Sequence, residues 1–267
     1  MSDNPIASHP QRPDSARLQR YVEASNMNFD ARRSSAYRQA DEAALARGRA
    51  AAHYSEVIRK LSLAFDRKID VLDVGCGTGR FFHSLANVRR LVGIDTSAQM
   101  LEQARDPVRK EQLDTETIEL MCGDVSSLTG SNGAFDLIYS IGVLGEFAPI
   151  DAPLLEKLAV LLKPDGVLFI TAVDTHSRMR MRVGGRVTLL RRALSRIFPH
   201  LPRSLRAMLN RHLSPCYVTR EQLEAMFAAS TFPTHSIRPY AHGQGWKGTH
   251  FQCIAYKNRN SASESQR

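Results

Sequence analysis

The residues best suited to bind a ligand lie between positions 71 and 79, where strand-forming residues lead into three glycines at alternate positions. The stretch reads Val71-Leu72-Asp73-Val74-Gly75-Cys76-Gly77-Thr78-Gly79. Glycine allows a turn that is too tight for side chains, so a ligand can lie against bare backbone N–H groups. The carboxylate of Asp73, inside the strand, suits a ligand that carries an ammonium group and a sulfonium.

The glycine spacing separates this turn from a dinucleotide site. It is G-x-G-x-G, from Gly75 through Gly77 to Gly79, whereas the dinucleotide fingerprint is G-x-G-x-x-G. Position 80 is Arg80, so the third glycine of that fingerprint is missing. A second acid, Asp95, lies where a second parallel strand should end, and its two oxygens could accept from both hydroxyls of a ribose.

Later segments continue the pattern at regular spacing. An acid follows a third expected strand in Met121-Cys122-Gly123-Asp124-Val125, and a fourth strand is expected over Phe135–Ser140. A helix is expected to end within Leu161–Gly166, where proline and glycine turn the chain into a fifth strand, Val167–Thr171. In this order, over about residues 69–174, the motifs resemble the class I S-adenosylmethionine-dependent methyltransferases of the small-molecule type.

The resemblance implies S-adenosyl-L-methionine as the cofactor. It implies that the glycine turn carries the amino-acid end of the cofactor, that Asp95 holds the ribose, and that Asp124 meets the adenine amine. Outside this context both acids would be read as helix caps. The cofactor-binding residues implied are Asp73, Gly75, Gly77, Gly79, Asp95, Thr96, Met100, Gly123, Asp124, Val125 and Ser140.

The order of elements predicts an α/β fold: a Rossmann-like, doubly wound, seven-stranded and mostly parallel sheet, with N-terminal helices and a helical insertion after the fifth strand. The last two strands are expected at His235–Tyr240 and His250–Lys257. The expected divisions are a disordered start (1–15), N-terminal helices (16–66), a methyltransferase domain (67–258) that contains an arginine-rich insertion (175–218), and a disordered tail (259–267).

Two side chains are candidates for contact with the acceptor or for the role of base. Glu146 follows the fourth strand, and His176 follows the fifth. A base is needed for an alcohol acceptor but not for a neutral amine or a thiolate, so the acceptor atom stays open. The alternative for Glu146 is a carboxylate near a helix start. Tyr37 and Tyr54 could cover the cofactor, although core packing is the simpler role for Tyr54, and His250 is expected to be structural.

The positive charge is concentrated in one segment. The chain has a net charge of +9, yet Thr175 to Arg220 contains eleven Arg and no acid. Helical spacing is expected within Arg186–Phe198 and Ser204–Leu213. The segment could be a lid with solvated arginines, could bind an anionic acceptor, or could contact an anionic membrane surface through 186–213. It lacks the interleaved aromatic residues of a single-strand binding groove, which argues against nucleic acid.

Composition sets the remaining expectations. The 267 residues and an apolar share of 43% are sufficient for a full core. Four cysteines without metal-ligand spacing, and a polar start without a signal-like run, predict a cytoplasmic protein without a metal site. The expected function is methyl transfer to a small-molecule or lipid-linked acceptor. An NAD(P)-dependent oxidoreductase and a non-catalytic S-adenosylmethionine-binding protein are the alternatives, and the oligomeric state is not indicated.

Overall fold

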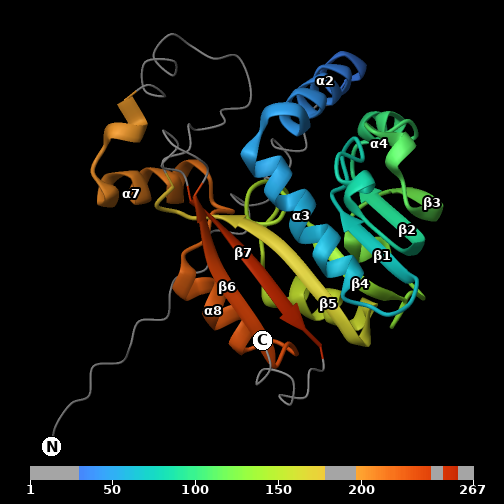
Figure 1. The fold of residues 1–267 in the computed structure, drawn as a ribbon. Coiled ribbons are helices and arrows are strands. Elements are labelled where there is room, and N and C mark those ends of the chain that lie inside the picture. The colour runs from blue at the N-terminus through green and yellow to red at the C-terminus, as the bar shows by residue number, and fades with distance from the viewer. Residues whose placement is uncertain (1–29, 178–196, 242–248, 258–267) are drawn as a thin grey trace, which may run out of the picture.

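The computed structural model describes residues 30–177, 197–241 and 249–257, and they contain a seven-stranded sheet of order β3-β2-β1-β4-β5-β7-β6 (Figure 1). Strands β1 to β5 pair with their neighbours in parallel, whereas β7 is antiparallel to β5 and β6. The bounds are β1 (Ile69–Val74), β2 (Val88–Asp95), β3 (Thr115–Cys122), β4 (Phe135–Ser140), β5 (Leu162–Val173), β6 (Thr234–Ala241) and β7 (Thr249–Tyr256). The predicted mostly parallel, Rossmann-like sheet is confirmed.

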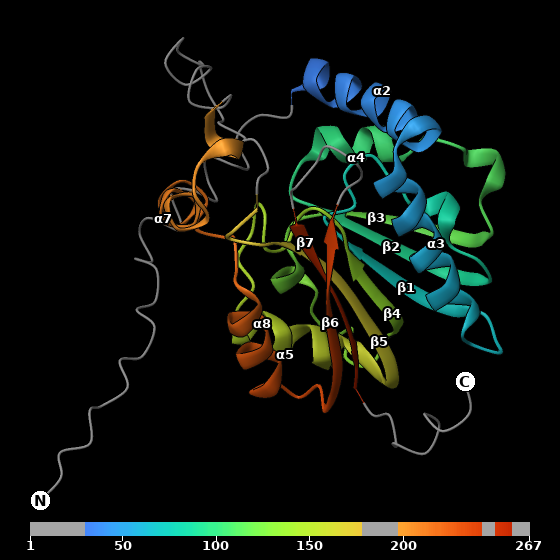
Figure 2. The ribbon, with the colours of Figure 1, turned by 60° about the vertical axis from the view of Figure 1, so that its left-hand side comes forward.

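Helices cover both faces of the sheet, and each face has its own apolar core. α3 and α4 pack with β1 and β2 on one face, and α5 and α8 pack on the other. α2 lies beyond the carboxyl ends of the parallel strands, next to α4 (Figure 2). The helices are α2 (Ala31–Arg47), α3 (Arg49–Leu63), α4 (Ala98–Ala104), α5 (Ala152–Leu161), α7 (Arg203–Leu213) and α8 (Arg220–Ala228).

The start of α8 follows the rules of helix capping. The hydroxyl of Thr219 accepts from the Gln222 backbone N–H, and the Gln222 side chain accepts from the Thr219 N–H, which completes a capping box for α8. Within the predicted N-terminal helical region 16–66, α2 and α3 are two separate helices. Gly48 adopts an extended conformation between α2 and α3, so the chain turns there before α3 packs on the sheet.

The junction between α5 and β5 differs from the expected turn. β5 begins at Leu162, directly after the helix, and Pro164 and Asp165 lie within the strand. The pairing of β5 with β4 shifts by several residues there, because Phe135 pairs with Leu162 while Leu137 pairs with Val167.

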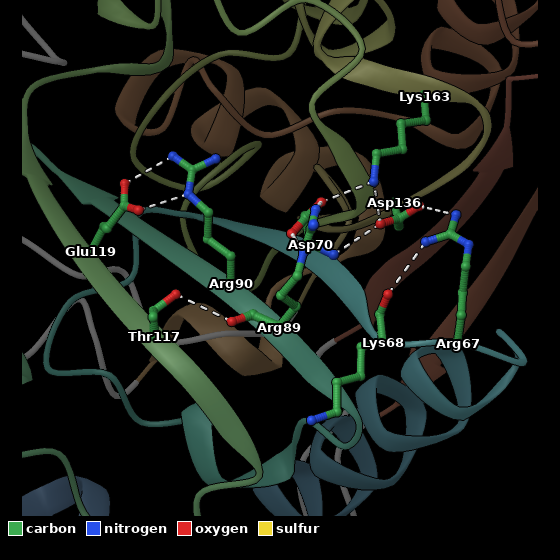
Figure 3. A network of polar contacts seen from close by, with 9 residues as sticks. All are labelled: Arg67, Lys68, Asp70, Arg89, Arg90, Thr117, Glu119, Asp136 and Lys163. Carbon is green, nitrogen blue, oxygen red and sulfur yellow. Dashed lines mark hydrogen bonds and ion pairs between the residues drawn. The ribbon is translucent and has the colours of Figure 1, made fainter.

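Lys163 lies at the centre of an ionic network at the end of the sheet where β1 and β4 begin (Figure 3). Its Nζ donates to Asp70 at 2.9 Å and to Asp136 at 2.7 Å, and both carboxylates are almost fully buried. Arg89 pairs with Asp70, and Arg67 pairs with Asp136 at 2.5 Å. Asp136 also accepts from the Asp70 backbone N–H at 2.8 Å, so the network links neighbouring strands.

The insertion after β5 is partly described. The helix expected over Ser204–Leu213 is confirmed as α7, whereas most of the stretch expected over Arg186–Phe198 lies outside the described residues, as do 1–15 and 259–267. α7 is tied to the end of β5, because the amide of Asn210 donates to the Thr175 carbonyl at 2.6 Å. Arg206 is also buried, and it donates to the Leu201 carbonyl at 2.7 Å. In the described part of the chain, no helix combines the length and hydropathy that a membrane crossing requires.

Candidate cofactor and acceptor site

A cavity of about 1320 Å³ opens at the carboxyl ends of β1, β2, β4 and β5, with α2 and α3 forming its opposite wall. Ligand pockets for a single small molecule measure roughly 300–1,000 Å³. The cavity therefore has room for two small molecules side by side. It also lies where open α/β sheets bind their ligands, outside the carboxyl ends of the strands.

Gly75 and Gly77 of the glycine turn line this cavity, whereas the predicted site residue Gly79 is not among its described lining residues. Gly75, Gly77 and Gly79 have φ angles of 75°, 55° and 73°, a region that residues with side chains rarely adopt. A Cβ on Gly75 would lie 2.5 Å from a methyl group of Val143. A Cβ on Gly77 would meet only Met100, at 3.6 Å, so this glycine presents open backbone to the cavity.

Asp95 joins the end of β2 to the glycine turn. One carboxylate oxygen accepts from the Gly77 N–H and the other from the Ser97 N–H, both at 2.9 Å. Each oxygen keeps a second lone pair, and Asp95 lines the cavity. Burial raises the pKa of this carboxyl, and the two backbone hydrogen bonds oppose the rise. The carboxylate thus has the capacity for two further hydrogen bonds, which a pair of ribose hydroxyls would use.

Asp73 is a buried acid in the cavity wall. Burial raises the pKa of its carboxyl to about 8, the nearby Asp95 adds to the rise, and the hydroxyl of Tyr139 opposes it. A carboxyl in this position is protonated in the empty site at neutral pH, and a cationic ligand would favour its ionised form. The geometry agrees with the predicted contact to a positively charged cofactor end.

The predicted cofactor-binding residues beyond the glycine turn also line the cavity, with one exception. Thr96, Met100, Gly123, Asp124 and Val125 all contribute to the wall. Asp124 also caps the short helix η3 (Val125–Ser127), because its carboxylate accepts from the Ser126 N–H at 2.7 Å.

The exception is Ser140, which is absent from the described wall of the cavity. Its side chain is fully buried, and its hydroxyl donates to the Val74 carbonyl at 2.7 Å, holding β4 to β1. The structure therefore gives Ser140 a structural contact instead of the predicted place beside the cofactor.

The two predicted catalytic residues are separated. Glu146 is buried and lines the cavity, near enough to Tyr54 for its charge to act on the phenol. Burial first, and then the charges of Tyr240 and Glu146, raise the pKa of Tyr54.

His176 is not brought to the described cavity wall. After β5 the chain pairs Asp174 with Val218, which directs His176 toward the insertion. There its ring nitrogen Nδ1 lies 3.1 Å from the Asp174 carboxylate. A catalytic role for His176 finds no support in this geometry.

Four further residues belong to the described cavity wall, and two of them, His250 and Asp41, were not expected there. His250 on β7, expected to be structural, is buried and lines the cavity. Tyr37 and Tyr54 both line the cavity, which agrees with the expectation that they could cover the cofactor. Tyr54, on α3, also belongs to the apolar core. Asp41 of α2 reaches the glycine turn, where it contacts Thr78 and Arg80. The sequence carries no local signal for Asp41, because only the packing of α2 against the turn creates the contact.

The comparisons with known proteins agree with this geometry. Residues 71–166 match a family model described as a methyltransferase domain. These residues include the glycine turn, Asp95, Asp124 and Glu146. This match identifies residues 71–166 as a methyltransferase domain.

The methyltransferase domain also has curated relatives. It is 33% identical over 107 residues to a ubiquinone biosynthesis O-methyltransferase of Coxiella burnetii, which is 40% of this chain and 44% of that protein. It is 36% identical over 118 residues to a trans-aconitate 2-methyltransferase of Variovorax paradoxus, which is 41% of this chain and 42% of that protein. The chain thus spans less than half the length of the curated relatives it matches.

A solved structure supports the fold over a longer stretch. The CurJ carbon methyltransferase superposes with a TM-score of 0.56 at 18% identity, covering 93% of this chain and 68% of that one. The likeness at this identity concerns the fold. The N-terminal helices and the strands after β5, which the methyltransferase-domain match does not include, therefore belong to the same architecture.

Proposed function

We propose that this protein transfers a methyl group from S-adenosyl-L-methionine to a small-molecule acceptor. The observation that carries the proposal is the joint placement of the left-handed Gly75 and Gly77 with Asp73 and Asp95 around one cavity, within a matched methyltransferase domain. The named relatives methylate small molecules, which supports the same acceptor class here.

The residues of the cavity fit this cofactor. Three acids line the cavity, the buried Asp73 and Glu146 and the half-buried Asp95, and this environment favours a cation such as a sulfonium or an ammonium group. The cofactor supplies a methyl carbon that is already electrophilic when bound. The protein's part is to align an acceptor lone pair with that carbon at about 3 Å and to exclude water.

Two measurements test the proposal directly. Calorimetry should detect binding of S-adenosylhomocysteine and no comparable binding of NAD, because the glycine spacing departs from the dinucleotide pattern. Incubation with methyl-labelled cofactor and a metabolite extract should then transfer label to a small molecule. Binding without transfer would leave a non-catalytic binding protein, and retention of NAD alone would favour the oxidoreductase.

The affinity for S-adenosylhomocysteine should rise with pH between about 6 and 8. Asp73, with a pKa of about 8 in the empty site, must lose its proton to pair with the ammonium group of the ligand. Below that pKa each binding event therefore releases a proton, and the affinity increases as the pH rises toward 8. Calorimetry in buffers of different ionisation enthalpy measures the release. In Asp73→Asn the release should vanish, and a wild-type affinity independent of pH would contradict the pairing.

Glu146→Gln should lower turnover about tenfold or more while leaving cofactor affinity within twofold. Glu146 is the one predicted base that the structure brings to the cavity wall. An acceptor hydroxyl transfers its proton near the transition state, and glutamine cannot accept it. Single-turnover rates with the acceptor found in the extract assay measure the effect. Full activity in the variant would favour an amine or thiolate acceptor that needs no base.

We further propose that the acceptor is lipid-linked and that the protein contacts a membrane surface. The start of the described insertion exposes apolar side chains at Ile197, Leu205 and Met208, with 54%, 37% and 49% of their surface accessible. Arginines lie on the same segment, a combination that suits an anionic surface. Sedimentation with vesicles rich in phosphatidylglycerol tests the contact, and protein left in the supernatant at low salt would refute it. We further propose that the protein acts in the cytoplasm, which fractionation of the source cells would test.

A further inference from the structure

Arg80 directly follows the glycine turn and is held in a defined position. Its guanidinium carbon lies 5.6 Å from the ring centre of Tyr37 and 5.6 Å from that of Phe81, within the range of cation–π contact. Its Nη2 pairs with the carboxylate of Asp41. Arg80 lines the cavity, and its side chain keeps 28% of its surface accessible.

Asp41 fixes this arrangement from the opposite wall. It belongs to α2, its side chain is fully inaccessible to solvent, and it accepts from the hydroxyl of Thr78 as well as from Arg80. The carboxylate therefore holds the residues on both sides of Gly79. Burial raises the pKa of Asp41, while the charge of Arg80 and the two hydrogen bonds favour the ionised form. The contact joins the N-terminal helix to the glycine turn.

The cofactor of the proposed function poses an electrostatic problem that this arrangement would solve. Its amino-acid end carries a carboxylate as well as an ammonium group, yet the acids near the turn include the buried Asp73 and the half-buried Asp95. A carboxylate beside these acids requires a cation for compensation. The sequence expectation supplied a partner for the ammonium group, Asp73, but none for the carboxylate.

The other cations of the described cavity wall are less suitable. Lys157, on α5, donates to the Leu128 carbonyl at 2.6 Å, which directs it toward the η3 side. Arg47 and Arg49 flank Gly48 at the junction of α2 and α3, on the helical wall. Arg80 alone among these four is adjacent in sequence to the glycine turn. A guanidinium has five N–H donors in a plane, so its pairing with Asp41 leaves donors for a second carboxylate.

We propose that Arg80 binds the carboxylate of the cofactor's amino-acid end and that Asp41 is its positioning residue. The inference rests on the proposed function, because it names a contact to that cofactor. It also explains why an arginine can stand where a dinucleotide turn requires glycine. The ion pair of Arg80 with Asp41 would couple the cofactor to α2, the helix that lies beyond the strand ends (Figure 2).

The test compares S-adenosylhomocysteine with 5′-methylthioadenosine, which lacks the amino-acid end. Arg80→Met keeps an apolar stem between the two aromatic rings but removes the charge. By calorimetry we expect the dissociation constant for S-adenosylhomocysteine to rise about 10- to 100-fold, with that for methylthioadenosine changed less than threefold. Arg80→Lys retains a point charge without the planar fork, so it should recover part of the loss. Asp41→Asn should weaken S-adenosylhomocysteine selectively, by about three- to tenfold.

Arg105→Met is the matched control, because Arg105 is exposed, pairs with Glu102 on the surface and does not line the cavity. It should leave both affinities unchanged. Equal losses for both ligands in Arg80→Met would assign Arg80 a structural role and overturn the inference, as would an unchanged affinity for S-adenosylhomocysteine. If the wild type bound neither ligand, the proposed function itself would fail. Retained methylthioadenosine binding shows that the variant has folded.

Discussion

Asp95→Ala is expected to weaken cofactor binding by roughly 2–4 kcal/mol, or about 30- to 1,000-fold in the dissociation constant. Each carboxylate oxygen already accepts one backbone N–H, from Gly77 or from Ser97, at 2.9 Å. The remaining lone pairs face the cavity and are those expected to receive the two ribose hydroxyls. Alanine therefore removes the ligand contacts and also releases the backbone that carries the cofactor.

The two contributions can be separated by a second substitution. Asp95→Asn keeps one acceptor oxygen and nearly the same shape, so it should preserve much of the turn while weakening the ribose contact. We expect the cofactor affinity of Asp95→Asn to lie between the affinities of the wild type and of Asp95→Ala. Asp66→Ala is the matched control, since Asp66 is exposed at the opposite end of β1. Calorimetry with S-adenosylhomocysteine gives all four values, and unchanged affinity in Asp95→Ala would refute the ribose assignment.

The glycine turn and Asp95 could be predicted because their signal is local. Three glycines at alternate positions require left-handed backbone, and an acid at the end of the next parallel strand must lie at the same edge of the sheet. Each inference needed only strand order and side-chain type. The capping box at Thr219 was predictable for the same reason, because it depends on residues three positions apart.

Features that depend on packing could not be read from the sequence. The hydroxyl of Ser140 turns to the Val74 carbonyl across a strand pair, and His176 follows a bend that the pairing of Asp174 with Val218 creates. Both residues follow strands at the expected places, yet neither lines the described cavity. Conversely, Asp41 lies 37 positions from Thr78, and only the placement of α2 brings the two together. Sequence position predicted which end of a strand a residue occupies, but not where its side chain points.

The same limit applies to the network around Lys163, whose members come from four separate segments (Figure 3). The contacts of Asp136 to Arg67, Lys163 and the Asp70 backbone give it a structural role. The network lies where the strands begin, whereas the cavity lies at their carboxyl ends. Substitutions in it should therefore change stability without changing cofactor affinity at temperatures where the protein is folded.

Lys163→Met is expected to lower the free energy of unfolding by about 2–3 kcal/mol. Removing one partner of a fully buried ion pair costs roughly 3–5 kcal/mol. The lower value applies because Lys163 keeps 26% of its side-chain surface accessible and because Asp70 and Asp136 retain Arg89 and Arg67. Urea denaturation followed by circular dichroism measures the loss. Lys60→Met is the control, since the Lys60–Glu56 pair is exposed and its removal should leave the midpoint unchanged.

The pH dependence of the same variant gives an independent check with a defined sign. Burial alone raises the pKa values of Asp70 and Asp136, but hydrogen bonds and charges from Arg89, Arg67 and Lys163 outweigh it and hold both below the ordinary value. Carboxyls whose pKa is lowered on folding stabilise the protein above their unfolded pKa, near 4, and lose that contribution as the pH falls further. Lys163→Met should raise both pKa values and move acid unfolding to higher pH. An acid midpoint equal to that of the wild type would mean that Arg67 and Arg89 alone hold the two carboxylates, and that Lys163 contributes packing but no charge compensation.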